Sequence, residues 1–320
     1  MKAAVRTRYG SPEVVRIAEI DKPAIHDHEV LVKVHATTVN RTDCGFRAAK
    51  PFIVRFFSGL IRPKAKVLGS EFAGVVEAVG PGVTSYAVGE RVFGFSEDRF
   101  GAHAEYLSMV EDGPLATMPA NMTFEEVAPS TEGSHYALAC IAKAKIRSGQ
   151  HVLVNGATGA IGSAAVQLLK RLGAVVTAVC DTEHVELVRG LGADRVIDYT
   201  AEDFTTDEQT YDVVFDAVGK SSFGRCKRLL EPGGFYLSTD LGPFAQNPIL
   251  ALITPLFGWK RAMMPIPPKH DQDRVKRFKE MIESGEFKPV IDRRYRLDQI
   301  VEAYRYVETG QKIGNVVIIV

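Results

Sequence analysis

The segment GATGAIG, residues 156–162, places three glycines at a spacing that suits dinucleotide binding. It follows an apolar run and precedes a helix-like SAAVQLLKRLG, and Asp181 comes nineteen residues after Gly162. In such a turn the glycines permit a tight bend, a close approach of the pyrophosphate and close helix packing, while the first N–H groups of the helix hold the phosphates. A purely structural turn is the alternative, but the strand, helix and carboxylate around the motif favour a cofactor site.

The candidate cofactor-binding residues lie at several places along this pattern. Val218 and Gly219, in the segment DAVG, follow a later strand at the edge where a ligand would bind. We expect the cofactor to contact Gly156, Thr158, Gly159, Ala160, Ile161, Gly162, Asp181, Tyr199, Val218 and Gly219.

The charges near Asp181 bear on which cofactor is bound. Its carboxylate could accept hydrogen bonds from both hydroxyls of the adenosine ribose, and Glu183 adds a second negative charge close by. A 2′-phosphate would meet like charges there, so we expect NADH to be favoured over NADPH. Two alternatives stay open: Asp181 could cap the following helix, and Arg189, Arg195 or Tyr199 could contact a phosphate.

The pattern of elements changes near residue 125. Before that point, short β-rich runs such as VLVKVHA are separated by glycine and proline, as an antiparallel barrel-like domain requires. From residue 151 onward, apolar runs alternate with helical periodicity, which predicts an α/β fold with a doubly wound parallel sheet. Its expected strands are His151–Asn155, Val175–Cys180, Arg195–Asp198, residues 212–218 and residues 234–239.

The C-terminal part predicts two helices and a closing strand. In HDQDRVKRFKEMIESGEF, apolar residues recur at helical spacing, and DQIVEAYRYVETG repeats the pattern before the apolar strand NVVIIV. Such an order is explained most simply if the chain returns to its first domain. We therefore expect residues 1–124 and 269–320 to form a substrate domain, and residues 125–268 to form an inserted dinucleotide-binding domain.

Composition excludes several functional classes. Thirty-nine Lys and Arg balance thirty-nine Asp and Glu among 320 residues, so nothing indicates nucleic-acid binding. The four cysteines form no CxxC pair, which indicates reduced, semi-buried thiols. The N-terminus has no apolar targeting region, and the longest apolar stretch, residues 248–259, is too short to span a bilayer. We expect a cytoplasmic protein.

Together these motifs resemble the quinone oxidoreductase branch of the medium-chain dehydrogenase/reductase superfamily. The similarity runs nearly end to end, through VNRTD, GSEFAGVVEAVG, GERVFGF, GATGAIG, LGADRVIDY, DAVG, LEPGG and GNVVIIV. The resemblance implies a GroES-like β-barrel substrate domain, an inserted Rossmann domain, an active cleft between them and, commonly, a homodimer.

Zinc-containing members of that superfamily hold a catalytic metal through a cysteine, a histidine and a further cysteine or acid. At the matching positions this chain has Asn40 and Ser70, no cysteine lies near residues 128–135, and the structural four-cysteine loop is absent. An amide and a hydroxyl are poor zinc ligands. Asp43, Glu71 and His135 could form a substitute site, but such carboxylates more often pair with arginine or cap a turn, so we expect no metal.

The expected loss of the metal changes the expected reaction. Reduction of a conjugated carbonyl needs mainly a hydride donor, positioning and donors for the developing oxyanion, and water could supply the final proton. The resemblance thus implies an NAD(P)H-dependent reductase of small apolar quinones or α,β-unsaturated carbonyl compounds. A catalytically weak nucleotide-binding regulator or structural protein of the same fold is the alternative, followed by a zinc-dependent alcohol dehydrogenase.

The candidate catalytic residues are Asn40, Lys64 and His135. Asn40 would contact the substrate through its amide or would only form the turn at a strand end. Lys64 would approach the carbonyl as a cation or lie exposed in a loop, and His135 would line the nicotinamide pocket or pack in the core. Some relatives place a tyrosine proton donor where this chain has Gly45.

The apolar segment formed by residues 242–268 is long for a loop in a compact domain. A buried helix followed by an edge strand is one interpretation. A wall over an apolar substrate, a dimer contact and a shallow membrane dock are the others, and of these we do not favour the membrane dock.

Overall fold

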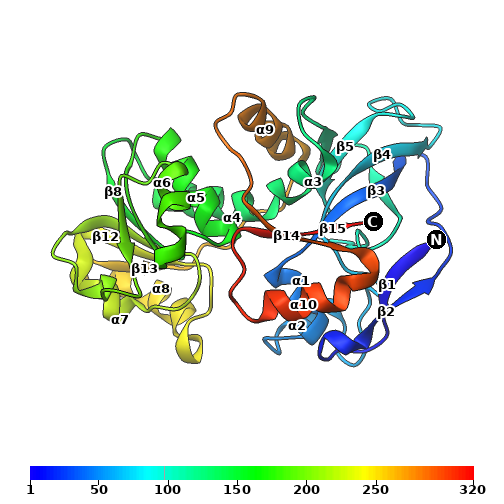
Figure 1. Cartoon of the computed structure of the whole chain (residues 1–320). Coiled ribbons are helices and arrows are strands. Elements are labelled where there is room, and N and C mark those ends of the chain that lie inside the picture. The colour runs from blue at the N-terminus through cyan, green and yellow to red at the C-terminus, as the bar shows by residue number, and fades with distance from the viewer. Residues whose placement is uncertain (97) are drawn as a thin grey trace. The chain divides into compact units, whose positions relative to one another are not determined.

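Alternating apolar runs and helical periods from residue 151 onward form a parallel sheet in the computed structural model, which describes residues 1–96 and 98–320 (Figure 1). The chain divides into two units. The parallel unit comprises residues 133–269 and 286–288, and the antiparallel unit comprises residues 1–132, 270–285 and 289–320. The division into functional domains at residues 124 and 268 stays a prediction.

The parallel unit consists of strands connected by helices. Its strands are β8 (His151–Asn155), β9 (Val175–Cys180), β10 (Arg195–Asp198), β11 (Tyr211–Asp216), β12 (Leu230–Ser238) and β13 (Arg261–Met263). Its helices are α4 (Glu132–Ala144), α5 (Ala160–Arg171), α6 (Val185–Gly190), α7 (Phe223–Cys226) and α8 (Gln246–Phe257). The strands pair in parallel in the order β10-β9-β8-β11-β12-β13, which confirms the expected fold class.

The first three strands of this sheet begin and end where the sequence predicts. Most residues of β8 and β9 are buried on both faces, and such strands read as continuous apolar runs that are easy to delimit, whereas β10 is only partly buried. β11 ends two residues earlier than expected, because the carboxylate of Asp216 accepts hydrogen bonds from the N–H groups of Val218 and Gly219 and turns the chain. β12 starts earlier than expected, because Leu230 pairs with Tyr211 across an irregularity in the ladder.

The antiparallel unit contains the two ends of the chain. Its strands are β1 (Lys2–Arg6), β2 (Val15–Glu19), β3 (Glu29–Val39), β4 (Glu71–Val79), β5 (Arg91–Phe95), β6 (Tyr106–Val110), β7 (Leu115–Thr117), β14 (Ile291–Arg296) and β15 (Asn315–Ile319). Its helices are α1 (Arg41–Ala48), α2 (Val54–Ser58), α3 (Phe124–Val127), α9 (Gln272–Glu283) and α10 (Ile300–Glu308).

The last strand of the chain completes the sheet that the early strands begin. β15 pairs antiparallel with β3, with Val316 opposite Val39, and the sheet runs β14-β15-β3-β4-β5-β7 with β6 also on β3. α9 buries the predicted apolar stripe of Val275, Phe278, Met281 and Ile282. The expected return of the chain to its first part is therefore present.

Residues 242–268 differ in part from the buried interpretation. β13 is an edge strand paired only with β12 within the described residues, as expected. The helix α8 is not buried, since Leu252, Leu256 and Phe257 are 76%, 74% and 86% exposed. Apolar composition predicted the helix correctly, but it could not show whether a neighbouring element covers the helix.

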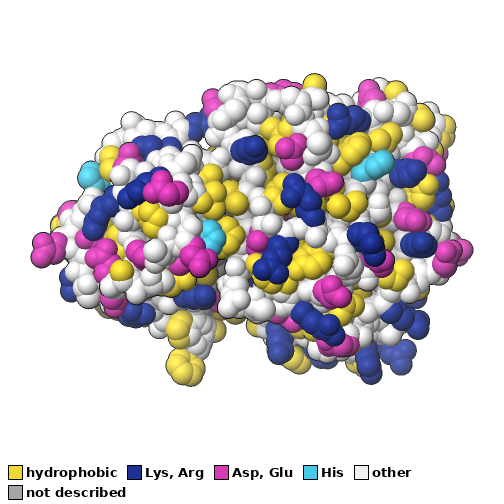
Figure 2. Space-filling view, viewed as in Figure 1, with side chains coloured by type: hydrophobic (Ala, Val, Ile, Leu, Met, Phe, Trp, Pro, Cys, Tyr) yellow, Lys and Arg dark blue, Asp and Glu magenta, His cyan; other side chains and the backbone are white. Residues whose placement is uncertain are grey.

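The surface mixes charges of both signs, as Figure 2 shows for one face, in keeping with the equal numbers of basic and acidic residues. Across residues 1–96 and 98–320, none of the helices has the length and apolarity that a membrane crossing demands. All four cysteines are buried and unpaired, and burial raises the pKa of Cys44 and of Cys140 to about 12. The thiols are thus more deeply buried than the semi-buried positions expected for them, and a raised thiol pKa lowers reactivity.

Candidate functional site

The glycine turn between β8 and α5 needs two of its glycines for the fold itself. Gly156 has φ +79°, and a Cβ there would lie 2.7 Å from the side chain of Val218. A Cβ on Gly162 would lie 2.1 Å from the carbonyl oxygen of Gly156, so any larger residue would push the helix off the turn. These two glycines therefore allow the strand, the turn and the helix to pack.

Gly159 is different, because the protein itself does not need its small size. Its φ of −69° is open to any residue, and among the described residues beyond its chain neighbours an added Cβ approaches only the carbonyl oxygen of Gly156, at 3.6 Å. A side chain at Gly159 would instead fill the space in front of the first turn of α5. The N–H groups of that turn have no partner within the helix, and the helix dipole adds positive charge there. The turn therefore fits the pyrophosphate of a dinucleotide.

The loop after β11 packs directly against the glycine turn. Val218 touches the position where Gly156 would carry a side chain, and it is 39% exposed. Asp216 is fully buried and accepts hydrogen bonds from Asn155 Nδ2 at 3.0 Å, Gly219 N at 3.0 Å and Tyr236 Oη at 2.9 Å. The sequence did not single out Asp216 or Asn155. Each is a polar residue at the carboxyl end of a strand. This shared position was the signal that could have indicated a hydrogen bond between the two loops.

Asp181 lies at the carboxyl end of β9, where the carboxylate was expected, but it also has a structural partner. Its side chain accepts a hydrogen bond from His184 N at 3.2 Å, as a cap, and pairs with His184 Nδ1. The capping alternative is therefore present in the structure. Tyr199 lies nearby, since its pKa is raised by burial and by the negative charge of Asp181. Asp181, His184 and Tyr199 together border the end of β9, and Glu183 is exposed beside them.

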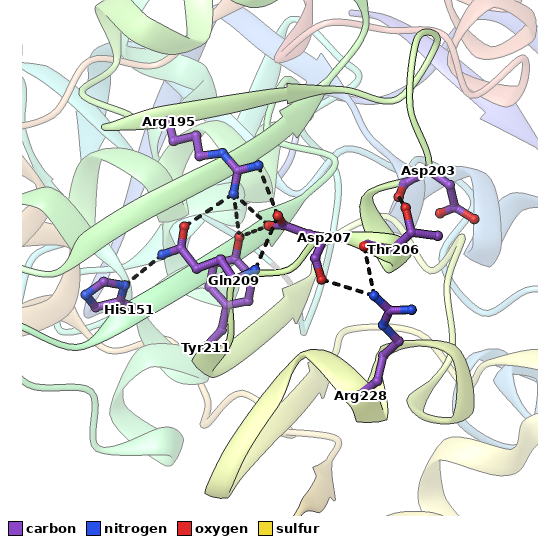
Figure 3. Close-up of polar contacts among 8 residues, drawn as sticks. All are labelled: His151, Arg195, Asp203, Thr206, Asp207, Gln209, Tyr211 and Arg228. Carbon is purple, nitrogen blue, oxygen red and sulfur yellow. Dashed lines mark hydrogen bonds and ion pairs between the residues drawn. The ribbon is translucent and has the colours of Figure 1, made fainter.

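Arg195 cannot contact a phosphate at this edge of the sheet. It is the first residue of β10, so it lies at the amino end of the strand, away from the glycine turn. Figure 3 shows its guanidinium directed at Asp207, which it meets at 2.7 and 3.0 Å, and at Gln209, which bonds His151 at the start of β8. The hypothesis of an Arg195–phosphate contact is therefore wrong. Arg189, the other arginine considered, pairs with Glu186 at 2.7 Å.

In the antiparallel unit, Asn40 begins α1 and is 4% exposed. Its Oδ1 accepts a hydrogen bond from Asp43 N at 2.8 Å, and its Nδ2 donates to Ser70 Oγ at 3.1 Å. Asp43 returns the contact by accepting from Asn40 N at 3.2 Å. Asn40 thus has the turn-forming role that was one of its two interpretations, and its role in substrate contact stays a prediction.

The positions that a catalytic zinc would use do not fit the metal. Asn40 and Ser70 bond to each other, and Asp43 accepts from Asn40 N with one oxygen and from Gly69 N, at 3.0 Å, with the other. Amide and hydroxyl groups are poor ligands for zinc. Throughout the part of the chain that the structure describes, His, Cys, Asp and Glu residues form no group of three or more arranged to hold a metal ion.

A cluster of buried carboxyl groups surrounds this position. Glu71 accepts four hydrogen bonds, from Thr38 Oγ1 at 2.7 Å, Thr131 N and Oγ1 at 3.0 Å each, and Glu132 N at 2.7 Å. Asp43 is fully buried, and burial raises its pKa to about 7. Burial also lowers the pKa of His103 to about 4, so this ring stays neutral and donates to the carbonyl oxygen of Thr38 at 2.7 Å.

Glu132 differs from Glu71 in having few donors of its own. The residue is 8% exposed, and burial followed by the charges of Glu71 and Asp43 raises the pKa of its carboxyl group well above the usual range. A hydrogen bond from the half-buried Thr42 and the positive charge of Lys312 oppose that shift. Burial in turn lowers the pKa of Lys312. Burial therefore favours the neutral form of the Glu132 carboxyl group over its ionised form.

The roles of the other two catalytic candidates, Lys64 and His135, stay predictions, and His135 follows Glu132 by three residues on α4. Lys64 is exposed in the loop after α2, as its second interpretation expected. His135 is 2% exposed on α4 in the parallel unit, with its ring 6.0 Å from that of Tyr136. Sequence reasoning missed Glu132, Thr42 and Lys312, which are distant in the chain. The acid between Thr131 and Gly133, within the segment where a zinc-containing relative would have a further ligand, was the available signal.

Comparisons with known proteins connect the two units to an enzyme class. The alcohol dehydrogenase GroES-like domain model matches residues 26–120, and the zinc-binding dehydrogenase model matches residues 191–318. An NADPH-dependent alkenal/one oxidoreductase, chloroplastic, of Arabidopsis thaliana is 31% identical, over 99% of this chain and 79% of the relative. The quinone oxidoreductase of Rattus norvegicus is 28% identical, over 100% of this chain and 98% of the relative.

A solved structure agrees in fold. The quinone oxidoreductase from Coxiella burnetii superposes with a TM-score of 0.88 at 24% identity, over 100% of this chain and 99% of the other. At that identity the likeness supports the fold, including the GroES-like part expected from the sequence.

Proposed function

The chain belongs to the quinone oxidoreductase and alkenal reductase branch of the medium-chain dehydrogenase/reductase superfamily, and on that premise we propose that it reduces quinones or α,β-unsaturated carbonyl compounds with NAD(P)H. The hydrogen bond from Asn40 to Ser70 is the main support for the metal-free reaction, because it joins the two side chains at the positions where a zinc ion would need ligands. Reduction of a conjugated carbonyl requires positioning and a proton source rather than a metal that acidifies an alcohol. The proposed reaction is therefore metal-free.

The glycine turn would hold the cofactor. Gly159 and the first turn of α5, with Thr158, Ala160 and Ile161, would receive the pyrophosphate, and Asp181 with Tyr199 would meet the adenosine ribose. A bound nicotinamide supplies the hydride. Val218 and Gly219, held by Asp216 against the glycine turn, would lie along the cofactor.

In the antiparallel unit, we assign the proton to Glu132. Its carboxyl group is buried, burial and the nearby charge of Glu71 raise its pKa, and the half-buried Thr42 hydrogen-bonds to it through its hydroxyl group. A hydroxyl group can pass a proton in a single step, by receiving one from the acid as it donates its own. Glu132 and Thr42 would thus protonate the substrate oxygen as negative charge develops on it, and solvent would later reprotonate Glu132.

Metal independence tests this proposal directly. Purified protein should oxidise NADH or NADPH in the presence of a panel of quinones and enones, and its rate should be unchanged after prolonged treatment with a strong chelator, because Asn40 and Ser70 engage each other. Metal analysis of the same samples provides the control. Stoichiometric zinc that leaves together with the activity would refute the proposal, as would the absence of any turnover.

Cofactor choice is the finer part of the proposal, and we expect NADH to bind more tightly than NADPH. Exchange of Asp181 for serine and Glu183 for arginine should reverse the order, by about 1–3 kcal/mol in relative binding free energy, since like-charge repulsion is replaced by a charge-assisted donor pair. Titration of nicotinamide fluorescence at two salt concentrations measures it, and added salt should reduce the difference.

The contact between Asp181 and His184 provides a control for that experiment. His184→Gln should leave the preference for NADH in place, because the acidic pair is retained. If the unmodified protein prefers NADPH, the acidic pair points away from the 2′ position. Arg189 and Tyr199 would then be the residues to examine, since Arg195 lies at the other edge of the sheet.

A homodimer and a cytoplasmic location complete the proposal. One relative is named as a chloroplast protein, so family membership alone does not assign a compartment. Sedimentation of the purified chain would measure its assembly state, and a dimer mass is the expected result.

A further inference from the structure

Residues 50–66, KPFIVRFFSGLIRPKAK, combine an excess of positive charge with large apolar side chains. This segment, here called the basic apolar segment, contains five Lys and Arg residues and no Asp or Glu, although the whole chain has equal numbers of both. Local charge of one sign within a neutral protein indicates an oppositely charged partner for that part of the surface.

The apolar side chains of the basic apolar segment face solvent. The exposed fractions are 67% for Phe52, 57% for Ile53, 64% for Phe56, 72% for Phe57, 59% for Leu60 and 85% for Ile61. Single exposed apolar residues are ordinary, but a contiguous group of this size marks an interaction site.

Contacts with the rest of the unit hold the backbone of the segment in place, so its apolar side chains have defined positions. Tyr9 Oη contacts Ser58 Oγ at 2.8 Å and donates to the carbonyl oxygen of Gly59 at 2.7 Å. The guanidinium of Arg55 lies over the rings of Tyr9 and Phe52, at 4.8 and 5.6 Å, and donates to Leu60 O at 3.1 Å. These contacts anchor the inner side of the segment and leave its apolar side chains outside.

The cations of the segment are available to a partner. Lys50, Arg62, Lys64 and Lys66 are exposed, and within residues 1–96 and 98–320 none of these four forms an ion pair with an acidic side chain. They lie at the two ends of the apolar group. A partner must therefore offer negative charge around an apolar interior, which is the chemistry of an anionic lipid surface: aromatic and aliphatic side chains enter the acyl boundary while Lys and Arg meet the headgroups.

We propose that the basic apolar segment docks the protein on an anionic lipid surface. An acidic protein would satisfy the charges, but it would also need an apolar patch whose shape matches this exposed group. A lipid interface accepts such side chains one by one. This inference goes beyond the proposed reductase function and does not depend on it.

The parallel unit independently carries a surface of the same chemistry. α8 contains no charged residue, and Leu256, Phe257 and Trp259 are 74%, 86% and 81% exposed. Lys260 follows at once and donates to the carbonyl oxygen of Lys227 at 3.1 Å, which places the exposed Lys227 and Arg228 beside the end of the helix. Figure 2 shows hydrophobic side chains projecting where Figure 1 draws the segment that contains α8.

Co-sedimentation of the full chain with vesicles tests the proposal. The protein should bind vesicles of phosphatidylcholine with about 30 mol% phosphatidylglycerol, should not bind vesicles of phosphatidylcholine alone, and should dissociate as salt rises. Equal binding to both vesicle types, or no binding to either, would overturn the proposal.

Paired variants identify the surface. Phe56→Ser with Phe57→Ser should weaken binding about tenfold or more through lost apolar insertion, and Arg62→Glu with Lys66→Glu should do the same through reversed charge. Val88→Ser, at a residue 63% exposed in the same unit, and Lys276→Glu with Arg277→Glu on α9 make matched changes elsewhere and should bind like wild type.

Thermal melts of all variants exclude misfolding as the cause of a loss. Sedimentation velocity without lipid distinguishes a contact between copies of the chain. The lipid proposal is wrong if two results are found together: the Phe56 and Phe57 changes convert an oligomer to a monomer, and the segment variants bind vesicles as well as wild type and the control variants do. The segment would then belong to an interface between copies of the chain.

Discussion

Replacement of Gly159 by valine is expected to weaken the binding of NADH and NADPH by at least about a hundredfold, without lowering the melting temperature. The backbone at Gly159 has ordinary dihedral angles, and within the described part of the chain a Cβ there meets one atom beyond its chain neighbours, at 3.6 Å, so the fold tolerates the change. The isopropyl group would occupy the space in front of the first turn of α5, where the pyrophosphate must approach the N–H groups. Fluorescence titration and a thermal melt measure the two quantities.

Two further glycines serve as controls for this prediction. Gly224→Val, on α7, should change neither property, because its added Cβ meets no described atom within 4 Å outside its own helix backbone and chain neighbours. Gly162→Val should lower the stability itself, because its Cβ would lie 2.1 Å from the carbonyl oxygen of Gly156. Wild-type cofactor affinity in a folded Gly159→Val protein would show that the pyrophosphate binds elsewhere.

The second large effect is expected for Glu132→Gln, which should reduce kcat by about a hundredfold or more. Glutamine preserves the size of the side chain and a donor for hydrogen bonding, but it cannot transfer a proton. Burial, Glu71 and Asp43 hold the pKa of Glu132 above its usual range, so the wild-type acid is present at low pH and is lost as pH rises through that pKa. Wild-type kcat should therefore fall on the alkaline side.

The pH profile and the Thr42 variants separate a proton donor from a structural residue. The alkaline decrease attributed to Glu132 should be missing from the glutamine variant, measured as kcat for a soluble enone with saturating cofactor. Thr42→Ser should retain turnover because it keeps the hydroxyl group, whereas Thr42→Val should lose it. A Glu132→Gln protein with the wild-type kcat and pH profile would assign the proton to bulk water instead.

The parallel sheet illustrates what local sequence can reveal. β8 and β9 have their expected bounds because a strand buried on both faces is a continuous apolar run, and the glycines after β8 mark the turn and the helix start by themselves. The periodicity of α9 likewise identified Val275 and Phe278 as buried before their partners were known. These features depend on neighbours in sequence, and the sequence alone was sufficient for them.

The exposure of α8 and the position of Arg195 could be known only from the tertiary structure. The composition of α8 predicts a helix but not whether another element covers its apolar face, and in the structure that face is exposed. Arg195 is close in sequence to the ribose-binding region, but strand direction places the first residue of β10 at the opposite edge of the sheet from the last. Arg195 is therefore near the ribose-binding region in sequence, but in space it is separated from that region by the length of the strand.

The acid cluster was decided by tertiary structure alone. Glu71, Glu132 and Lys312 come from β4, the start of α4 and the segment before β15, and only the return of the chain to pair β15 with β3 brings them together. The sequence determined that Asn40 and Ser70 are unsuited to zinc, because ligand chemistry belongs to residue type. Which carboxyl group keeps a proton depends instead on burial and on the donors around it, and the folded chain alone supplies those.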